Sequence, residues 1–173
     1  MRFFLLALII AVLLIGSEGC MEPSVRYVRD ADGNVHMMVP GNWDYRTYYK
    51  VPRARLKKIV DSYLGTRYKN GGTSRKGVDC SGFVFLVFQK IAGATLPRSS
   101  GKLWKQGKGV AVDEARAGDL VFFRGGIFNV INHVGIYMGN GAFIHSSNKN
   151  GVMYDTLDEV YYKKRFAGIR RIF

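Results

Sequence analysis

Three side chains in this 173-residue chain have the types that nucleophilic catalysis needs: one of its two cysteines and two of its three histidines. Cys80 lies between a glycine-rich polar segment and the apolar run 83–88, so the sequence predicts that it opens a buried helix with Asp79 as the N-cap. A thiol in the first turn of a helix lies at the positive end of the helix dipole, which favours the thiolate. The residues around Cys80 fit an inert buried thiol equally well, because free cysteine is usually buried.

The two histidines lie in predicted strands on either side of the turn Gly139-Asn140-Gly141. With Asn140 at the centre, His133 lies seven residues before it and His145 five residues after it. Because these offsets differ by two, the sequence predicts that both side chains share one face of the sheet as diagonal neighbours. One imidazole could then act as a base while the other holds it in the required orientation and tautomer.

A metal ion is the competing use for a histidine pair. A metal site needs a third and usually a fourth ligand at a matching spacing. The remaining histidine, His36, lies in the N-terminal segment, where it is an ordinary strand or loop residue. The sequence therefore predicts neither a metal ion nor a cofactor.

The N-terminus has the pattern of an export signal. A basic start is followed by the apolar run 3–15, which is too short to span a membrane comfortably, and then by small residues, so residues 1–19 are a predicted signal peptide. Cys20 resembles the lipidated cysteine of bacterial lipoproteins, although Ser17 and Glu18 depart from the usual pattern before it. Lipidation of Cys20 is the prediction, and simple secretion or an uncleaved anchor is the alternative.

The cysteine count bears on the role of Cys80. If Cys20 carries lipid, Cys80 has no partner for an internal disulfide. A lone cysteine in an exported protein is exposed to oxidation, so its presence indicates that the thiol itself is used. A disulfide between Cys20 and Cys80 is the alternative.

The chain is strongly basic, with a net charge of +13. Its positive residues cluster at Arg53-Ala54-Arg55-Leu56-Lys57-Lys58, at residues 102–108, and from Lys163-Lys164-Arg165 through Arg170-Arg171. Such a surface attracts polyanions, which for an exported bacterial protein are anionic lipid headgroups or cell-wall polymers. A solvated surface that adds solubility is the alternative. The chain has no nucleic-acid recognition motif, so no nucleic acid is expected as a partner.

Helical patterns come first in the chain and strand patterns second. The predicted helices cover 53–63, which begins after Pro52, 80–91, whose aromatic content also fits a strand, and a short helix near 103–106 capped by Ser99 or Ser100. The predicted strands are 120–123, 130–138, 142–146, 152–154 and 166–173, and residues 157–162 are a short helix or loop. This order predicts an α+β domain with a mostly antiparallel sheet of about five strands.

The segment before this domain, residues 20–51, is polar and aromatic. It is a predicted tether with a flap on the domain rather than a separate domain. Asp32-Gly33 lies between 27–28 and 35–39 and predicts a short hairpin there.

Six segments, in order, resemble the NlpC-type bacterial cell-wall cysteine peptidases. They are Tyr68-Lys69-Asn70-Gly71-Gly72, Asp79-Cys80-Ser81-Gly82-Phe83, Leu96-Pro97-Arg98-Ser99-Ser100, Ala117-Gly118-Asp119-Leu120-Val121-Phe122-Phe123, Asn132-His133-Val134-Gly135-Ile136-Tyr137 and Phe143-Ile144-His145-Ser146-Ser147. The resemblance covers residues 52–173, which we therefore expect to be the peptidase domain. It is nearest to lipoproteins with a single catalytic domain.

This resemblance implies a papain-like α+β fold in which the nucleophile helix packs on the sheet. The implied activity is hydrolysis of amide bonds in peptidoglycan stem peptides, typically between the γ-carboxyl of D-glutamate and the diamino acid. By motif match, Cys80 is the nucleophile, His133 the base and His145 the residue that orients His133.

The resemblance also implies roles for residues around the nucleophile. Tyr68 matches a tyrosine associated with the oxyanion. Asp79 and Ser81 match positions that help to bind the free amino end of the stem peptide, although Asp79 has a rival role as helix cap. Arg98 matches a family position as well, with a purely structural role as the alternative to substrate binding.

Together these observations predict a murein endopeptidase that is lipid-anchored in the cell envelope and faces the periplasm or cell wall. A wall-binding lipoprotein without catalysis is one alternative. Another amidase or acyltransferase chemistry on the same fold is a second.

Overall fold

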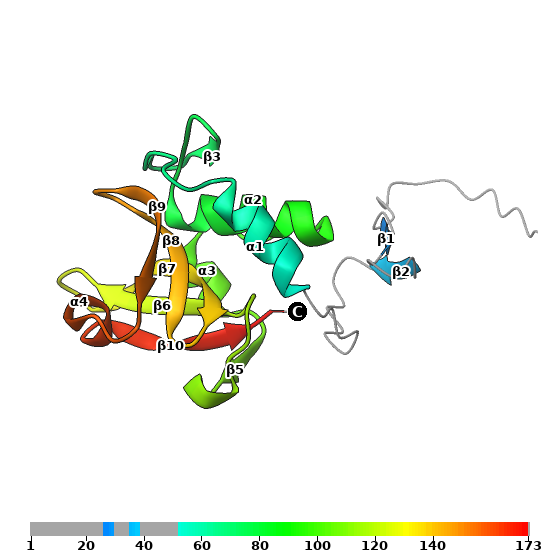
Figure 1. The fold of residues 1–173 in the computed structure, drawn as a ribbon. Coiled ribbons are helices and arrows are strands. Elements are labelled where there is room, and N and C mark those ends of the chain that lie inside the picture. The colour runs from blue at the N-terminus through cyan, green and yellow to red at the C-terminus, as the bar shows by residue number, and fades with distance from the viewer. Residues whose placement is uncertain (1–25, 30–34, 39–51, 173) are drawn as a thin grey trace, which may run out of the picture.

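The structure is a computed structural model that describes residues 26–29, 35–38 and 52–172. Its helices are α1 (Arg53–Asp61), α2 (Cys80–Ala92), α3 (Ser100–Trp104) and α4 (Val160–Lys163), with a 3-10 turn at Val112–Glu114. Its strands are β1 (Arg26–Arg29), β2 (Val35–Met38), β3 (Thr73–Ser74), β4 (Gly77–Val78), β5 (Lys108–Val110), β6 (Leu120–Gly125), β7 (Val130–Gly139), β8 (Ala142–Ser147), β9 (Gly151–Thr156) and β10 (Phe166–Arg171). Figure 1 shows this α+β arrangement.

The main sheet has six strands in the order β5-β10-β6-β7-β8-β9, and every neighbouring pair is antiparallel. The prediction of about five strands missed β5, which pairs with β10 at one edge. This strand has only three residues, two of them Lys108 and Gly109. It therefore has no alternating apolar pattern by which a strand is recognised.

Both faces of the sheet are buried. Along β6, Leu120 and Phe122 belong to a core shared with α1, α2 and α3, whereas Val121 and Phe123 belong to a second core that includes Tyr162 of α4. In Figure 1, α1 and α2 lie together on one side of the sheet. A strand with two covered faces is apolar at successive positions, which is why β6 has four consecutive apolar residues.

The helix that begins with Cys80 is confirmed as a helix rather than a strand. Asp79 is its N-cap, and Gly93 ends it with a φ of 63°, a left-handed conformation that glycine adopts easily. The predicted helix at 53–63 is also present, but the helical part ends at Asp61. Ser99 occupies the N-cap position of α3, yet its side chain makes no capping hydrogen bond.

The N-terminal hairpin is confirmed by the antiparallel pairing of β1 with β2, in which Val28 lies opposite His36. The predicted signal peptide 1–19 and Cys20 lie outside the described residues. Among the helices of the described part, none combines the length and apolar character that a membrane span requires.

Candidate active site

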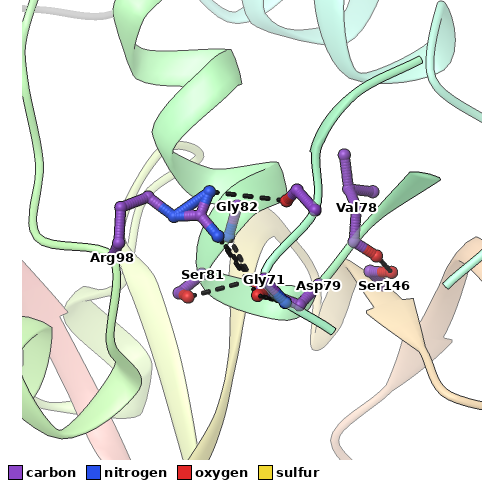
Figure 2. Close-up of polar contacts among 8 residues, drawn as sticks. Gly71, Val78, Asp79, Ser81, Gly82, Arg98 and Ser146 are labelled. Atoms are coloured by element: carbon purple, nitrogen blue, oxygen red, sulfur yellow. Dashed lines mark hydrogen bonds and ion pairs between the residues drawn. The ribbon is translucent and has the colours of Figure 1, made fainter. Parts of the chain in front are cut away.

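The start of α2 is fixed by a carboxylate whose two oxygens are both engaged. Oδ1 of Asp79 accepts from the backbone N–H of Gly82 at 2.6 Å and from the hydroxyl of Ser81 at 2.9 Å. Oδ2 accepts from the backbone N–H of Gly71 at 2.7 Å and from Nη2 of Arg98 at 3.1 Å. Figure 2 shows these contacts converging on the helix end. Because Cys80 lies between two of these residues, the contacts also fix the position of its backbone.

Arg98 reaches this carboxylate through a gap that only glycine leaves open. Its Nη1 donates to the carbonyl of Gly72 at 3.4 Å. A Cβ at Gly82 would lie 2.1 Å from that carbonyl oxygen and 2.8 Å from Nη1 of Arg98. The Arg98 guanidinium therefore packs directly against the backbone of the first helical turn, and its Nε is buried without a hydrogen-bond partner.

The contacts of Asp79 and Ser81 are those of a helix cap. Both residues are buried, with 7% and 5% of their surface exposed. Arg98 forms an ion pair with the carboxylate of Asp79, a contact that fits a structural role for the arginine. Binding of a peptide amino end by these residues stays a prediction.

A second contact ties the histidine strand to the same region. The hydroxyl of Ser146, next to His145, donates to the carbonyl of Val78 at 2.9 Å (Figure 2). Val78 lies two residues before Cys80. This bond therefore fixes β8 relative to the residues that lead into α2.

Cys80 is a free thiol and is 9% exposed. Burial raises its pKa, and hydrogen bonds from the backbone N–H groups of Val134, Ser81 and Cys80 itself act in the opposite direction without cancelling that effect. The contact with Val134 places the sulfur beside the residue that follows His133. This direction opposes the thiolate that the helix terminus favours, because desolvation disfavours the charged form of the sulfur.

The two histidines meet as the hairpin offsets predicted. Nε2 of His133 lies 2.8 Å from Nδ1 of His145, and the two rings are nearly perpendicular at 86°. In the register of β7 and β8, Ile136 pairs with Ile144, and a bulge follows Tyr137. The bulge lies on the turn side of both histidines, so it does not disturb their diagonal relation.

The pKa values of both imidazoles are lowered in this setting, which favours their neutral forms. Burial and the neighbouring His145 lower the pKa of His133 from 6.5 to about 3. Burial also lowers the pKa of His145, although Asp155 opposes this effect. Within the described part of the chain, Nδ1 of His133 has no hydrogen-bond partner. That nitrogen is therefore the one that remains free to accept a proton.

Tyr68 is paired with the residues that lead into Cys80. It forms a parallel bridge with Val78, two residues before the cysteine. Its pKa is raised by burial and by the negative charges that Cys80 and Asp79 can carry. A role at the oxyanion stays a prediction.

Two residues at this site were missed from the sequence. Oδ2 of Asp155 lies 2.7 Å from Nε2 of His145, and the hydroxyl of Tyr162 donates to the same oxygen at 2.8 Å. The offset rule used for the histidines finds Asp155 as well, because His145 pairs with Met153 and Asp155 follows two residues later. Tyr162 has no such signal, since α4 brings it to the site from outside the sheet.

In the part of the chain that the structure describes, no three histidine, cysteine or acidic side chains are grouped as metal ligands. The side chains around His133 instead form a hydrogen-bonded row that ends at a carboxylate. A thiol, an imidazole base and a group that orients this base are the components of nucleophilic amide hydrolysis.

The α+β fold is that of papain-like domains. The chain belongs to the NlpC/P60 family, whose model matches residues 65–171. The chain is 44% identical over 118 residues to the murein DD-endopeptidase MepS/murein LD-carboxypeptidase of Escherichia coli K12, a match that covers 66% of this chain and 62% of the relative. It is also 44% identical over 119 residues to the probable endopeptidase NlpC of the same organism, with 69% and 77% covered.

A solved structure shows the same fold. The crystal structure of an NlpC/P60 family protein from Bacillus cereus matches with a TM-score of 0.64 at 33% identity, over 70% of this chain and 41% of that one. This chain spans 62% of the length of the murein DD-endopeptidase that it matches.

Proposed function

We propose that the chain is a cysteine endopeptidase that hydrolyses amide bonds in the stem peptides of peptidoglycan. One observation carries this proposal. A buried thiol at the start of α2 lies next to Val134, while the neighbouring His133 has one ring nitrogen on His145 and the other free. The names of the relatives support the choice of murein as the substrate class.

The reaction follows from the groups present. The thiol of Cys80 transfers its proton to Nδ1 of His133, and the sulfur attacks the amide carbon. The backbone N–H of Cys80, together with Tyr68, stabilises the negative oxygen that forms. The protonated His133 then gives its proton to the leaving amine, and a thioester remains. His133 next takes a proton from water, the hydroxide releases the acid from the thioester, and the proton returns to the sulfur.

The bond that we propose is the one between the γ-carboxyl of D-glutamate and the diamino acid. The second candidate is the bond that a murein DD-endopeptidase cuts, because the chain is 44% identical to a relative with that name. The chemistry at Cys80 is the same for both bonds. The choice between them depends on how the stem peptide lies in the site.

We further propose that the enzyme is exported and acts in the cell envelope, with Cys20 as a lipid anchor that faces the periplasm or cell wall. The net charge of +13 supports contact with anionic wall or lipid polymers, and no nucleic acid is proposed as a partner.

The test is mass spectrometry of purified muropeptides after incubation with the full chain. Wild type should release two fragments whose masses sum to substrate plus water and identify the bond. Cys80→Ala should release none, and the exposed loop variant Thr95→Ala should match wild type. Cleavage by Cys80→Ala at the wild-type rate would refute the mechanism.

The same experiment separates the alternatives. A wall-binding lipoprotein would retain muropeptides without cutting them, and Cys80→Ala would bind as well as wild type. An acyltransferase would give products heavier than any hydrolysis fragment, because an acceptor amine or hydroxyl would take the acyl group from the thioester in place of water.

A further inference from the structure

His145 is held on its far side by two side chains that the mechanism above does not use. Its Nε2 lies 2.7 Å from Oδ2 of Asp155 and 3.1 Å from the hydroxyl of Tyr162. The Tyr162 hydroxyl also donates to Oδ2 of Asp155 at 2.8 Å. The three groups therefore form a closed triangle of hydrogen bonds behind the imidazole.

The sheet register lines these groups up with the base. His145 pairs with Met153, and Asp155 lies two residues further along β9. His133 and His145 have the same diagonal relation across β7 and β8. Three adjacent strands therefore carry an imidazole, a second imidazole and a carboxylate in one row.

The surroundings hold the row in one orientation. His145 is 1% exposed, and the side chain of Asp155 is 11% exposed. The rings of Phe143 and Tyr162 pack against the imidazole of His145 with centroids 5.2 Å and 5.5 Å away. A carboxylate in such a position is costly unless it accepts hydrogen bonds, and here it accepts two on one oxygen.

The acceptor at the end of the row determines where each proton lies. A carboxylate oxygen only accepts, so Nε2 of His145 carries the hydrogen. A neutral imidazole has one N–H, so Nδ1 of His145 is an acceptor. Nε2 of His133, 2.8 Å away, must then be a donor, and Nδ1 of His133 is left with a lone pair.

We propose that Asp155, steadied by Tyr162, is a positioning residue that fixes both histidines as Nε2–H tautomers and so keeps Nδ1 of His133 ready to accept a proton. These tautomers exist only if both imidazoles are neutral, and the lowered pKa values of His133 and His145 favour the neutral forms. The use of Nδ1 to accept the proton of Cys80 rests on the proposed function, whereas the tautomers do not.

Without the carboxylate of Asp155, the hydrogen bond between the two histidines can reverse its direction. Nδ1 of His145 could then carry the hydrogen and donate to Nε2 of His133. The single N–H of His133 would move to Nδ1, and the ring would present no lone pair where the mechanism needs a base. In serine-protease triads, exchange of the carboxylate for an amide has this consequence, a histidine in place but in the wrong tautomer.

The first test needs neither a variant nor a substrate. Imidazole ¹⁵N shifts in the ¹⁵N-labelled full chain distinguish the two tautomers, and the chain has three histidines, so His36→Gln identifies the signal that does not belong to the site. The Nε2–H form at both His133 and His145 is expected near neutral pH. The Nδ1–H form at either one overturns the proposal.

The second test compares Asp155→Asn with Asp158→Asn, an exposed acid close by in the sequence that makes the same change of charge. Asp155→Asn should lower kcat on the muropeptide substrate by about 10- to 100-fold while KM stays within about threefold, and should populate the Nδ1–H form. Asp158→Asn should match wild type. If Asp155→Asn keeps both Nε2–H tautomers, the proposal fails whatever its kcat.

A milder variant covers the case in which Asp155→Asn does not fold. Tyr162→Phe keeps the ring in its core and removes only the hydroxyl, with the exposed Tyr161→Phe as its control. We expect a loss of kcat smaller than that of Asp155→Asn. An unchanged kcat in Tyr162→Phe would remove Tyr162 from the proposal. If the wild-type protein shows no peptidase activity but both histidines are the predicted tautomers, the proposed function is refuted. The assignment of Asp155 as a positioning residue still stands in that case.

Discussion

Protonation of His133 should cost folding free energy, because partial burial and the neighbouring His145 both lower the pKa of its imidazole. The pKa of His133 is lowered from 6.5 to about 3 in the folded chain. Between these two pH values the unfolded chain binds a proton that the folded chain does not. The free energy of unfolding should therefore fall as the pH falls from about 6.5 towards 3, by up to about 1.4 kcal/mol for each pH unit. Urea unfolding at a series of pH values measures this slope.

The matched variant is His133→Asn, which keeps a polar side chain but cannot take up the proton. Its stability should depend less steeply on pH in the same window, so the difference from wild type should grow steadily with acidity. Parallel curves for the two proteins would show that His133 titrates normally in the fold.

The side-chain chemistry of the site could be predicted only in part. The offsets about Asn140 predicted the contact of His133 with His145, and the helix signal predicted the cap at Asp79; both are confirmed. The charge state of Cys80 was not predictable, because it depends on how far the surrounding chain excludes water from the thiol. That quantity exists only once the helix is packed.

The packing of the first turn of α2 requires glycine at position 82. Alanine in place of glycine inside a helix usually adds stability, by about 0.5–1 kcal/mol. At Gly82 we expect the opposite, because a Cβ would lie 2.1 Å from the carbonyl oxygen of Gly72 and 2.8 Å from Arg98. Gly82→Ala should destabilise by about 1–3 kcal/mol, which in a chain of this length lowers Tm by about 2–4 °C for each kcal/mol. Calorimetry measures the shift.

Gly101 in α3 is the matched control, since a Cβ there would meet its nearest atoms at 3.9 Å. Gly101→Ala should leave Tm unchanged or raise it. Equal effects of the two substitutions would mean that the tight approach at Gly82 is relieved at little cost.

The elements differed in how far they could be predicted. Those with a strong period or strong end signals, such as α2 and the hairpin of β7 and β8, are confirmed. The elements that were missed or left open are β3, β4, β5, the 3-10 turn and α4, and each has two to four residues. Elements this short are formed by their neighbours rather than by local pattern, and α4 supplies Tyr162. Tyr162, which contacts both His145 and Asp155, was therefore the hardest residue of the site to predict.

The positive charge of the molecule predicts that it binds to anionic membranes. A net charge of +13 should produce binding to vesicles that contain anionic lipid, with affinity that falls as salt screens the charges. Vesicles of neutral lipid measure any contribution from the apolar N-terminus. The signal attributable to charge is the difference between the two in a sedimentation assay.

Two exposed lysines on different helices, Lys58 and Lys102, allow this to be checked without touching the site. The double variant Lys58→Glu/Lys102→Glu lowers the net charge by four and should weaken binding to anionic vesicles while muropeptide cleavage is unchanged. Binding that is independent of both salt and charge reversal would show that the basic surface contributes only solubility.

The raised pKa of the Cys80 thiol has a consequence for the lifetime of the molecule. Peroxide attacks thiolates far faster than thiols, and the oxidised forms beyond sulfenic acid do not return. A thiol that was always ionised would be oxidised faster than one whose proton is held more tightly. Because burial raises the pKa of the Cys80 thiol, the same desolvation that makes the sulfur harder to ionise should also slow its oxidation.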